Sequence, residues 1–156
     1  MRSLIRAAAV IAAAVAFYVV VVLPYRGNLV LRAVAERSEL ARATSPDRAA
    51  VAARDNLVAL ERVAGSRRLD PTWYMLYAAN CELLDRGPQA VDAYTRALRI
   101  DDRPELYVNR AMIRLRLGQT DAAVADLTLA ARFNPGVLDE IDGDLRARVA
   151  AAAGLP

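Results

Sequence analysis

Apolar residues follow two different patterns along the chain. Residues 7–23 read AAAVIAAAVAFYVVVVL without a charge, whereas from about residue 28 onward apolar residues recur every three or four positions between polar ones. The second pattern is typical of amphipathic helices, in which residues i, i+3, i+4 and i+7 share one face. We find no candidate strand after residue 23. The sequence therefore predicts an all-α protein.

The N-terminal apolar run predicts a transmembrane signal anchor over residues 1–24. A helix of the 20 residues from Leu4 to Leu23 is about 30 Å long, the thickness of the hydrocarbon core of a bilayer. A cleaved signal peptide is the alternative, but cleavage after an Ala-x-Ala pattern in residues 12–16 would leave an apolar stretch on the mature chain.

Charges flanking this run suggest its orientation. Arg2 and Arg6 favour a cytoplasmic N-terminus, although the arginines that follow the run compete with them. We expect a single-pass protein of the inner (cytoplasmic) membrane whose C-terminal domain is periplasmic or extracellular.

Residues 25–68 predict a juxtamembrane helical hairpin. Its first helix, about 28–44, is expected to place one set of apolar residues on one side: Leu29, Val30, Ala33, Leu40 and Ala43. Ser45 is a suitable N-cap for the second helix, and Pro46 suits its first turn. The second helix, 47–64, has the apolar residues Val51, Leu57, Val58, Leu60 and Val63.

Residues 71–136 contain one pattern twice. Shifting the chain by 33 residues aligns the segment 71–103 with the segment 104–136. The aligned pairs are Pro71 with Pro104, Tyr74 with Tyr107, Ala78 with Ala111, Leu84 with Leu117, Ala90 with Ala123, Val91 with Val124, Tyr94 with Leu127 and Ala97 with Ala130. Small residues recur where helices must approach closely, and large apolar ones fill the spaces between them. The pattern predicts two helix-turn-helix repeats in a short solenoid.

The second copy resembles a tetratricopeptide repeat. The residues that carry the likeness are Tyr107, Ala111, Leu117, Gly118, Ala123, Leu127, Ala130 and Pro135. The first copy is weaker, since its closing proline is replaced by Asp102, and Leu69-Asp70-Pro71 looks like the end of one more unit. Residues 25–68 are therefore open to interpretation as a drifted repeat. Ankyrin units share the period, but their Thr-Pro-Leu-His opening is absent.

The segment after the repeats predicts a capping helix. Residues 137–152 place Leu138, Ile141, Leu145 and Val149 at helical spacing opposite a charged face. A helix that is apolar inside and charged outside closes the end of a solenoid. The C-terminal domain, 69–156, is thus expected to hold two repeats and this cap.

The resemblance also implies a binding groove, because the first helix of each tetratricopeptide unit lines a concave face. The groove residues expected here are Met75, Ala79, Glu82, Leu83, Glu105, Val108, Asn109, Met112 and Arg116. Such a mostly apolar surface suits an extended segment or a helix of a protein partner, with Met75 and Met112 as anchors. The clamp that holds a partner's terminal carboxylate needs several basic residues that this face lacks, so heat-shock chaperones are not expected partners.

Two arginines depart from the apolar pattern of the second repeat. We expect Arg110 to pair with Asp126 on the second helix of the same repeat. Arg114 is expected to reach solvent or to meet Asp101 or Asp102.

Composition narrows the chemistry that the chain can perform. The sequence has no His and a single Cys, Cys81, which we interpret as a small buried hydrophobe. Thiol-histidine catalysis and the usual zinc sites are therefore not expected. We also expect no cofactor, no small-molecule substrate and no enzymatic activity.

Charge is unevenly distributed. All 21 basic residues are arginine, and residues 29–68 hold 8 of them against 5 acids, whereas residues 69–156 hold 10 against 13. The basic part lies next to the apolar run, where arginine favours anionic lipid head groups. Nucleic acid is not an expected partner, because no basic stripe with interleaved aromatic residues occurs.

Two functions fit these features. The first is a membrane-tethered tetratricopeptide scaffold that assists the assembly of an envelope or membrane complex through protein–protein contacts. The second is a permanent small accessory subunit of a larger membrane complex, with its span buried against other helices. A repeat partner of an O-antigen-ligase-like polysaccharide enzyme is a less favoured form of the first.

Overall fold

A computed structural model describes residues 11–67, 69–141 and 143–155, and these residues form helices joined by short turns, with no strand among them. The predicted all-α class is therefore confirmed. In chain order the longer helices are α2 (Leu23–Arg42), α3 (Pro46–Val63), α4 (Pro71–Leu83), α5 (Gly87–Leu98), α6 (Pro104–Arg116), α7 (Thr120–Phe133) and α8 (Gly143–Ala153). Short helical segments add η1 (Tyr18–Val22), η2 (Ala64–Ser66) and η3 (Pro135–Glu140).

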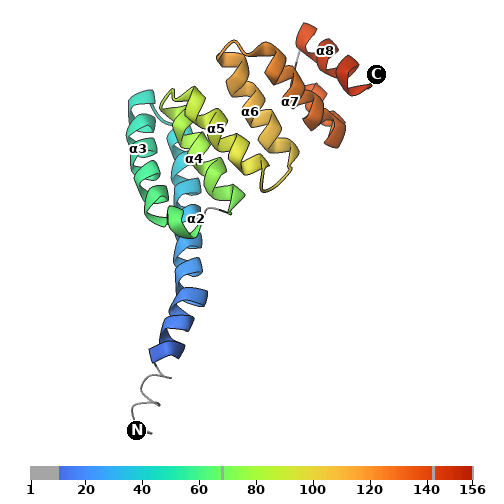
Figure 1. The fold of residues 1–156 in the computed structure, drawn as a ribbon. Coiled ribbons are helices and arrows are strands. Elements are labelled where there is room, and N and C mark those ends of the chain that lie inside the picture. Colours follow the sequence, from blue (N-terminus) through green and yellow to red (C-terminus); the bar gives the residue numbers. More distant parts are fainter. Residues whose placement is uncertain (1–10, 68, 142, 156) are drawn as a thin grey trace, which may run out of the picture.

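Antiparallel neighbours pair along the chain. Helices α2 and α3 form one hairpin, α4 and α5 the next, and α6 and α7 a third, and the hairpins stack side by side (Figure 1). Proline lies within the first two residues of α3, α4, α5 and α6, where its missing N–H costs no hydrogen bond. Ser45 has the extended backbone of an N-cap before Pro46, although its side chain makes no capping hydrogen bond.

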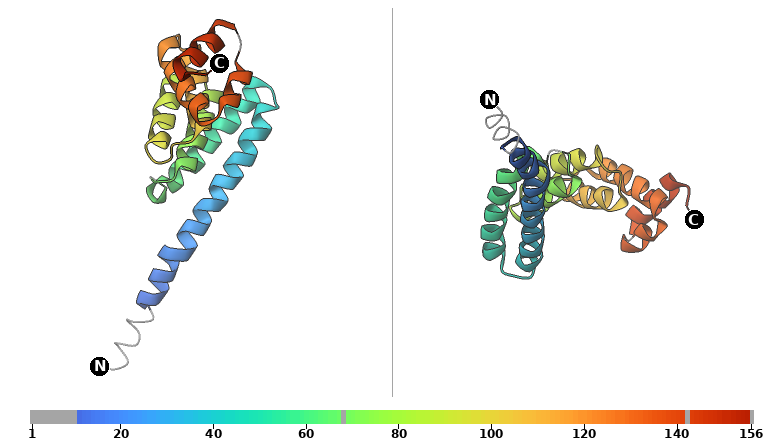
Figure 2. Two further views of the ribbon diagram at one scale, coloured as in Figure 1. Left: turned by 90° about the vertical axis from the view of Figure 1, so that its right-hand side faces the viewer. Right: turned by 90° about the horizontal axis from the view of Figure 1, so that it is seen from below.

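The first hairpin continues into a long helical shaft. Residues 11–17 are helical, the helix widens to a π-helix over Tyr18–Val22, and it then runs on through α2 without a break. The part before α2 projects away from the hairpins (Figures 1 and 2). Its side chains from residue 11 to residue 20 are all exposed. Residues 4–10 of the predicted anchor lie outside the described residues.

At Gly27 the turn between α3 and α4 contacts the shaft. It is buried, and a Cβ at this position would lie 2.4 Å from the guanidinium of Arg67. Arg67 follows η2 and pairs with Asp70 at 3.1 Å. The turn between α3 and α4 therefore lies beside residue 27 of the shaft.

Buried apolar residues form two clusters. One joins the first two hairpins and the start of the third around Leu57, Leu60 and Tyr94. The other joins α6, α7, η3 and α8 around Leu127 and Val149. Ala78, Ala90, Ala111 and Ala123, the small residues of the repeated pattern, are completely buried.

The first hairpin buries different faces from those that its apolar residues predict. Leu40 is 69% exposed and Val51 is 55% exposed, while α2 instead buries Leu31, Val34, Ser38 and Ala41 and α3 buries Ala49, Ala53, Asn56, Leu57 and Leu60. Leu57 and Leu60 are buried as their apolar character suggests, but the side predicted for α2 was wrong because the buried faces also contain polar residues. Their hydrogen-bonding groups are satisfied across the helices, which a reading of apolar periodicity cannot detect.

Three of these polar side chains form one hydrogen-bonded group between α2, α3 and α4. The Ser38 hydroxyl donates to Asn80 Oδ1 at 3.2 Å and accepts from both asparagines, at 3.1 Å from Asn56 and 3.0 Å from Asn80. Asn56 Nδ2 also donates to Asn80 Oδ1 at 3.0 Å, and Asn80 Nδ2 donates to the Leu76 carbonyl at 2.8 Å. Directional contacts of this kind fix how the three helices pack.

The C-terminal segment is two helical pieces rather than the single predicted helix over 137–152. Asn134 caps η3 by accepting a hydrogen bond from the Gly136 N–H at 3.1 Å, and the chain is extended at Ile141. Gly143 then has φ +60°, a left-handed conformation that interrupts a continuous helix. Leu138, Ile141 and Val149 are nevertheless buried as predicted.

Enlarging a buried alanine tests this packing. Ala111→Leu or Ala123→Leu should lower the free energy of unfolding by about 1 to 3 kcal/mol, because the added atoms overpack a crossing between helices. Ala125→Leu is the matched control, since Ala125 is exposed on the same helix as Ala123. Urea unfolding of all three variants measures the difference. Equal stability of Ala123→Leu and Ala125→Leu would contradict the assigned crossing.

Candidate partner-binding groove

A hollow opens on one side of the stacked hairpins, between α2, α4 and α6. It has a volume of about 270 Å³ and is lined by Ala35, Ser38, Glu39, Arg42, Met75, Leu76, Ala79, Tyr94 and Asn109. Helix α4 supplies its centre, α2 and α6 its two sides, and Tyr94 reaches it from α5. A hollow of this size accommodates a side chain of a partner rather than a typical small-molecule ligand, whose pockets occupy about 300 to 1,000 Å³.

Helix α6 extends the hollow as an exposed strip, which together with the hollow we call the groove. Glu105, Asn109, Met112 and Arg116 recur at helical spacing and are all exposed. Met112 is 39% exposed, an open position for a large apolar side chain. Val108 and Leu83 are half-buried, and Val108 packs on the second core cluster.

Two charge pairs lie along the groove. Arg42 donates to Glu39 at 3.0 Å on α2, and Arg116 donates to Glu82 at 2.7 Å between α6 and α4. These contacts leave little excess charge for a strongly acidic or basic ligand. The floor beneath them is apolar, with Met75 half-buried and Leu76 and Ala79 buried.

Tyr94 lies beneath this floor and is 2% exposed. Burial, and to a lesser extent Glu82, raises the pKa of Tyr94 to about 12 against the opposing effect of Arg42 and Arg116. The phenol is therefore protonated at neutral pH. The side chain belongs to the core cluster beneath the hollow rather than to its exposed surface.

The structure brings together only some of the nine residues predicted to line the groove. Met75, Ala79 and Asn109 line the hollow, while Glu82, Glu105, Met112 and Arg116 lie on α4 and α6 outside its lining. Sequence reasoning missed the side contributed by α2, namely Ala35, Ser38, Glu39 and Arg42, and it missed Tyr94. The drifted-repeat interpretation of residues 25–68 was the available signal, because it would place α2 on the same face as α4 and α6.

A larger hollow of about 570 Å³ lies on the other side of α4, between α3 and α5. Its aromatic wall is Trp73, Tyr74 and Tyr77, with the Trp73 ring stacked on Tyr77 at 5.2 Å and edge-on to Tyr74 at 4.9 Å. Trp73 Nε1 donates to the Leu60 carbonyl at 2.8 Å. The tryptophan thus fastens α4 to α3.

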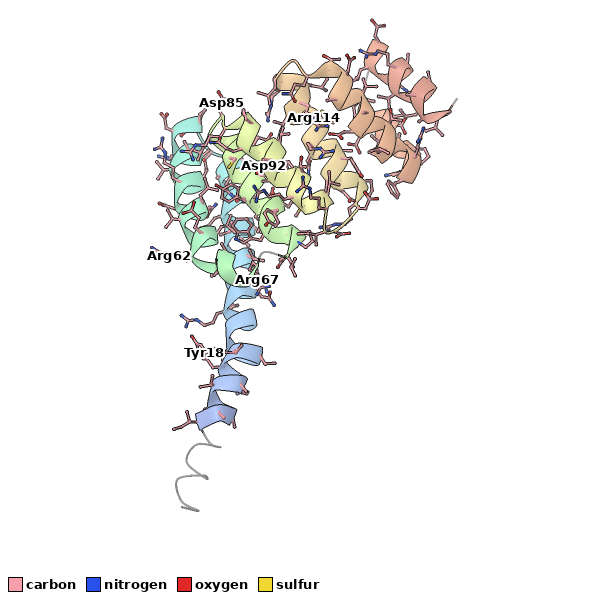
Figure 3. The ribbon with its side chains drawn as sticks, viewed as in Figure 1. Tyr18, Arg62, Arg67, Asp85, Asp92 and Arg114 are labelled. Carbon is pink, nitrogen blue, oxygen red and sulfur yellow. The ribbon has the colours of Figure 1, made fainter. Side chains whose placement is uncertain are left out.

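A buried charge cluster joins the second and third hairpins. Arg110 donates to both carboxylate oxygens of Asp126, at 2.6 and 2.9 Å, and to the Thr95 hydroxyl at 2.9 Å. The predicted pair of Arg110 with Asp126 is confirmed. The prediction for Arg114, which Figure 3 labels, was wrong: Arg114 too donates to Asp126, at 2.7 Å, because it lies one turn beyond Arg110 on α6.

Cys81 is buried, as predicted, and burial raises the pKa of its thiol while Arg86 lowers it. The thiol is therefore protonated and shielded at neutral pH. In the part of the chain that the structure describes, no three acidic or sulfur-containing residues are grouped as they would be around a metal ion.

No protein-family model matches this sequence, and neither a curated protein nor a solved structure does. Among the described residues, no helix is both long enough and apolar enough to cross a membrane.

Proposed function

We propose that the chain is a membrane-tethered scaffold of the tetratricopeptide type, whose groove holds an apolar segment of a protein partner during assembly of an envelope or membrane complex. The observation that carries this proposal is the groove itself. Its floor is apolar, and the charges that flank it on α2 and between α4 and α6 are already paired. A helix or extended segment with one large apolar side chain complements these features.

Repeat packing supports the tetratricopeptide assignment. Ala78 and Ala111 occupy equivalent positions 33 residues apart, and both are completely buried on the first helix of their hairpins. Ala90 and Ala123 are buried in the same way on the second helices. In addition, α2 and α3 form a hairpin that stacks on these two, so the groove spans three units.

Exposure of the N-terminal helix supports a tether within residues 4–23. Ile11, Val15, Phe17 and Val20 are between 57% and 71% exposed, and they belong to a helical segment that projects away from the stacked hairpins (Figure 1). Exposed apolar surface of this extent is costly in water. We propose that it lies in the inner membrane, with the N-terminus cytoplasmic and the helical domain on the periplasmic or outer side.

The same exposed surface also fits the second candidate, an accessory subunit whose helix is buried against other membrane helices. The two functions differ in stoichiometry. Purification in mild detergent should yield one fixed complex for the accessory subunit, and several substoichiometric partners for the scaffold.

Charge placed in the groove tests the proposal. Changing Met75 and Met112 together to Glu should abolish capture of the partner, because apolar anchors dominate such interfaces. Partner capture is measured by photo-crosslinking from position 109 in intact cells. Val51→Glu with Val58→Glu is the matched control, since these valines are 55% and 48% exposed on α3 away from the groove.

A second variant separates binding from folding. Met75 packs partly against the core, whereas Asn109 and Met112 are exposed, so Met112→Glu with Asn109→Glu should leave the melting temperature unchanged. Crosslinking for this variant is read from Arg116 in place of position 109. Persistent capture of the same partner by this folded variant would show that the groove is not the binding surface.

A further inference from the structure

The three turns that follow α3, α5 and α7 lie at one end of the helical domain. Helices α2 to α7 run alternately up and down, so these turns lie on the side of the domain from which the shaft projects; the turn after α3 is nearest the shaft, and those after α5 and α7 lie successively farther from it (Figure 1). Each turn exposes a large apolar side chain. Leu69 is 85% exposed, Phe133 is 56% exposed and Ile100 is 38% exposed.

Arginines accompany these apolar side chains. Arg26, Arg62 and Arg99 are exposed, and within the described residues none of them makes an ion pair. Figure 3 shows Arg62 and Arg67 at the end of the domain that adjoins the shaft. Of the acids nearby, Asp70 pairs with Arg67 and Asp101 with Arg103 at 2.7 Å, while Glu61 and Asp102 are exposed.

The position of this end along the shaft is fixed by the contact between Arg67 and Gly27. An α-helix rises 1.5 Å per residue, so residue 27 is only about 6 Å beyond residue 23, where the predicted anchor ends. The polar head-group layer on each side of a bilayer is about 5 to 8 Å thick. A membrane that holds the shaft up to residue 23 would therefore meet the turn between α3 and α4.

We propose that this end of the domain, the membrane-facing edge, rests on an anionic lipid surface. It is made of Leu69 and Ile100 with Arg26, Arg62 and Arg99. Leu69 enters the boundary between head groups and acyl chains, and the arginines contact lipid phosphates. The inference rests on the membrane tether proposed above, and it adds that the domain lies on the bilayer rather than standing clear of it.

A fluorescent probe at two matched leucines tests this arrangement in the full chain. Leu69→Cys and Leu40→Cys, each in a Cys81→Ala background, receive the same dye and are reconstituted in vesicles of phosphatidylcholine and phosphatidylglycerol. Leu40 is also strongly exposed, but it lies about 20 Å farther along α2 than Gly27. With nitroxide on the lipid head groups, quenching at position 69 should be several-fold stronger than at position 40.

Arginine variants test the electrostatic part. Arg62→Gln with Arg99→Gln should reduce quenching at position 69, as should vesicles of phosphatidylcholine alone. Arg48→Gln is the control, because Arg48 lies at the opposite end of α3 from Arg62. Unchanged quenching at position 69 after either change would overturn the role of anionic lipid.

The outcomes also separate this inference from the tether itself. Equal quenching at positions 69 and 40 in chains that resist alkaline extraction would overturn the membrane-facing edge alone. Chains that alkali removes from the vesicles would overturn both proposals.

Discussion

Replacing Asp126 by alanine is expected to lower the free energy of unfolding by about 3 to 5 kcal/mol, because it removes the carboxylate that two largely buried arginines share. Asp126 is 2% exposed and accepts hydrogen bonds from Arg110 and Arg114, whose side chains are 11% and 19% exposed. Without the carboxylate, two guanidinium groups remain between α5, α6 and α7 with no counter-charge. Denaturant unfolding followed by circular dichroism measures the loss.

A surface pair provides the comparison. Asp92→Ala removes an acid of the same type from the pair that it makes with Arg96 on α5, where both side chains are more than half exposed. That change should cost no more than about 1 kcal/mol. Equal effects of the two substitutions would mean that Asp126 does not hold both arginines in solution.

Asn80→Ala should be the second most damaging substitution, with a loss of about 3 kcal/mol. Asn80 is completely buried and contacts Ser38 and Asn56, so its removal leaves both side chains without their shared partner. One buried acceptor atom of the group, Asn56 Oδ1, already has no hydrogen-bond partner. The loss of Asn80 would add further buried polar atoms without partners. The melting temperature in thermal unfolding reports the change.

Asn109→Ala is the control for this substitution, because Asn109 is exposed on α6 and should contribute within about 0.5 kcal/mol. If Asn80→Ala and Asn109→Ala melt together, the polar group does not fix the first hairpin against α4.

The repeated region was the most predictable part of the fold. Alanines at matched positions 33 residues apart had to lie at close helix crossings, and Ala78 and Ala111 do. Arg110 could be paired with Asp126 because a buried arginine needs an acid within reach on the facing helix. The partner of Arg114 could not be predicted in the same way, because residue spacing does not show that one carboxylate accepts hydrogen bonds from two arginines.

The first hairpin shows where sequence reasoning failed. Its buried face is partly polar, so apolar periodicity gave no reason to place Ser38 and Asn56 in the core, while Leu40 and Val51, which were among the apolar residues of the predicted helices, are exposed. Ser38 and Asn56 are buried because they contact Asn80 on α4, and the position of Asn80 relative to them depends on tertiary packing. The groove was incomplete for the same reason, because its α2 side could be assigned only once the buried face of α2 was known.

The helix is unbroken from residue 11 to Arg42, so the number of residues in the shaft determines the direction in which the groove faces. Each residue of an α-helix turns the chain by about 100°, so one residue more or fewer below Gly27 would aim the groove at a different azimuth around the shaft. Inserting seven residues adds nearly two whole turns, so the groove would face almost the original direction while the domain moved by about 10 Å along the helix axis. The length of the shaft thus determines both the distance of the groove from the membrane and the direction in which it faces. A partner fixed in the same membrane would meet the groove at only one combination of the two.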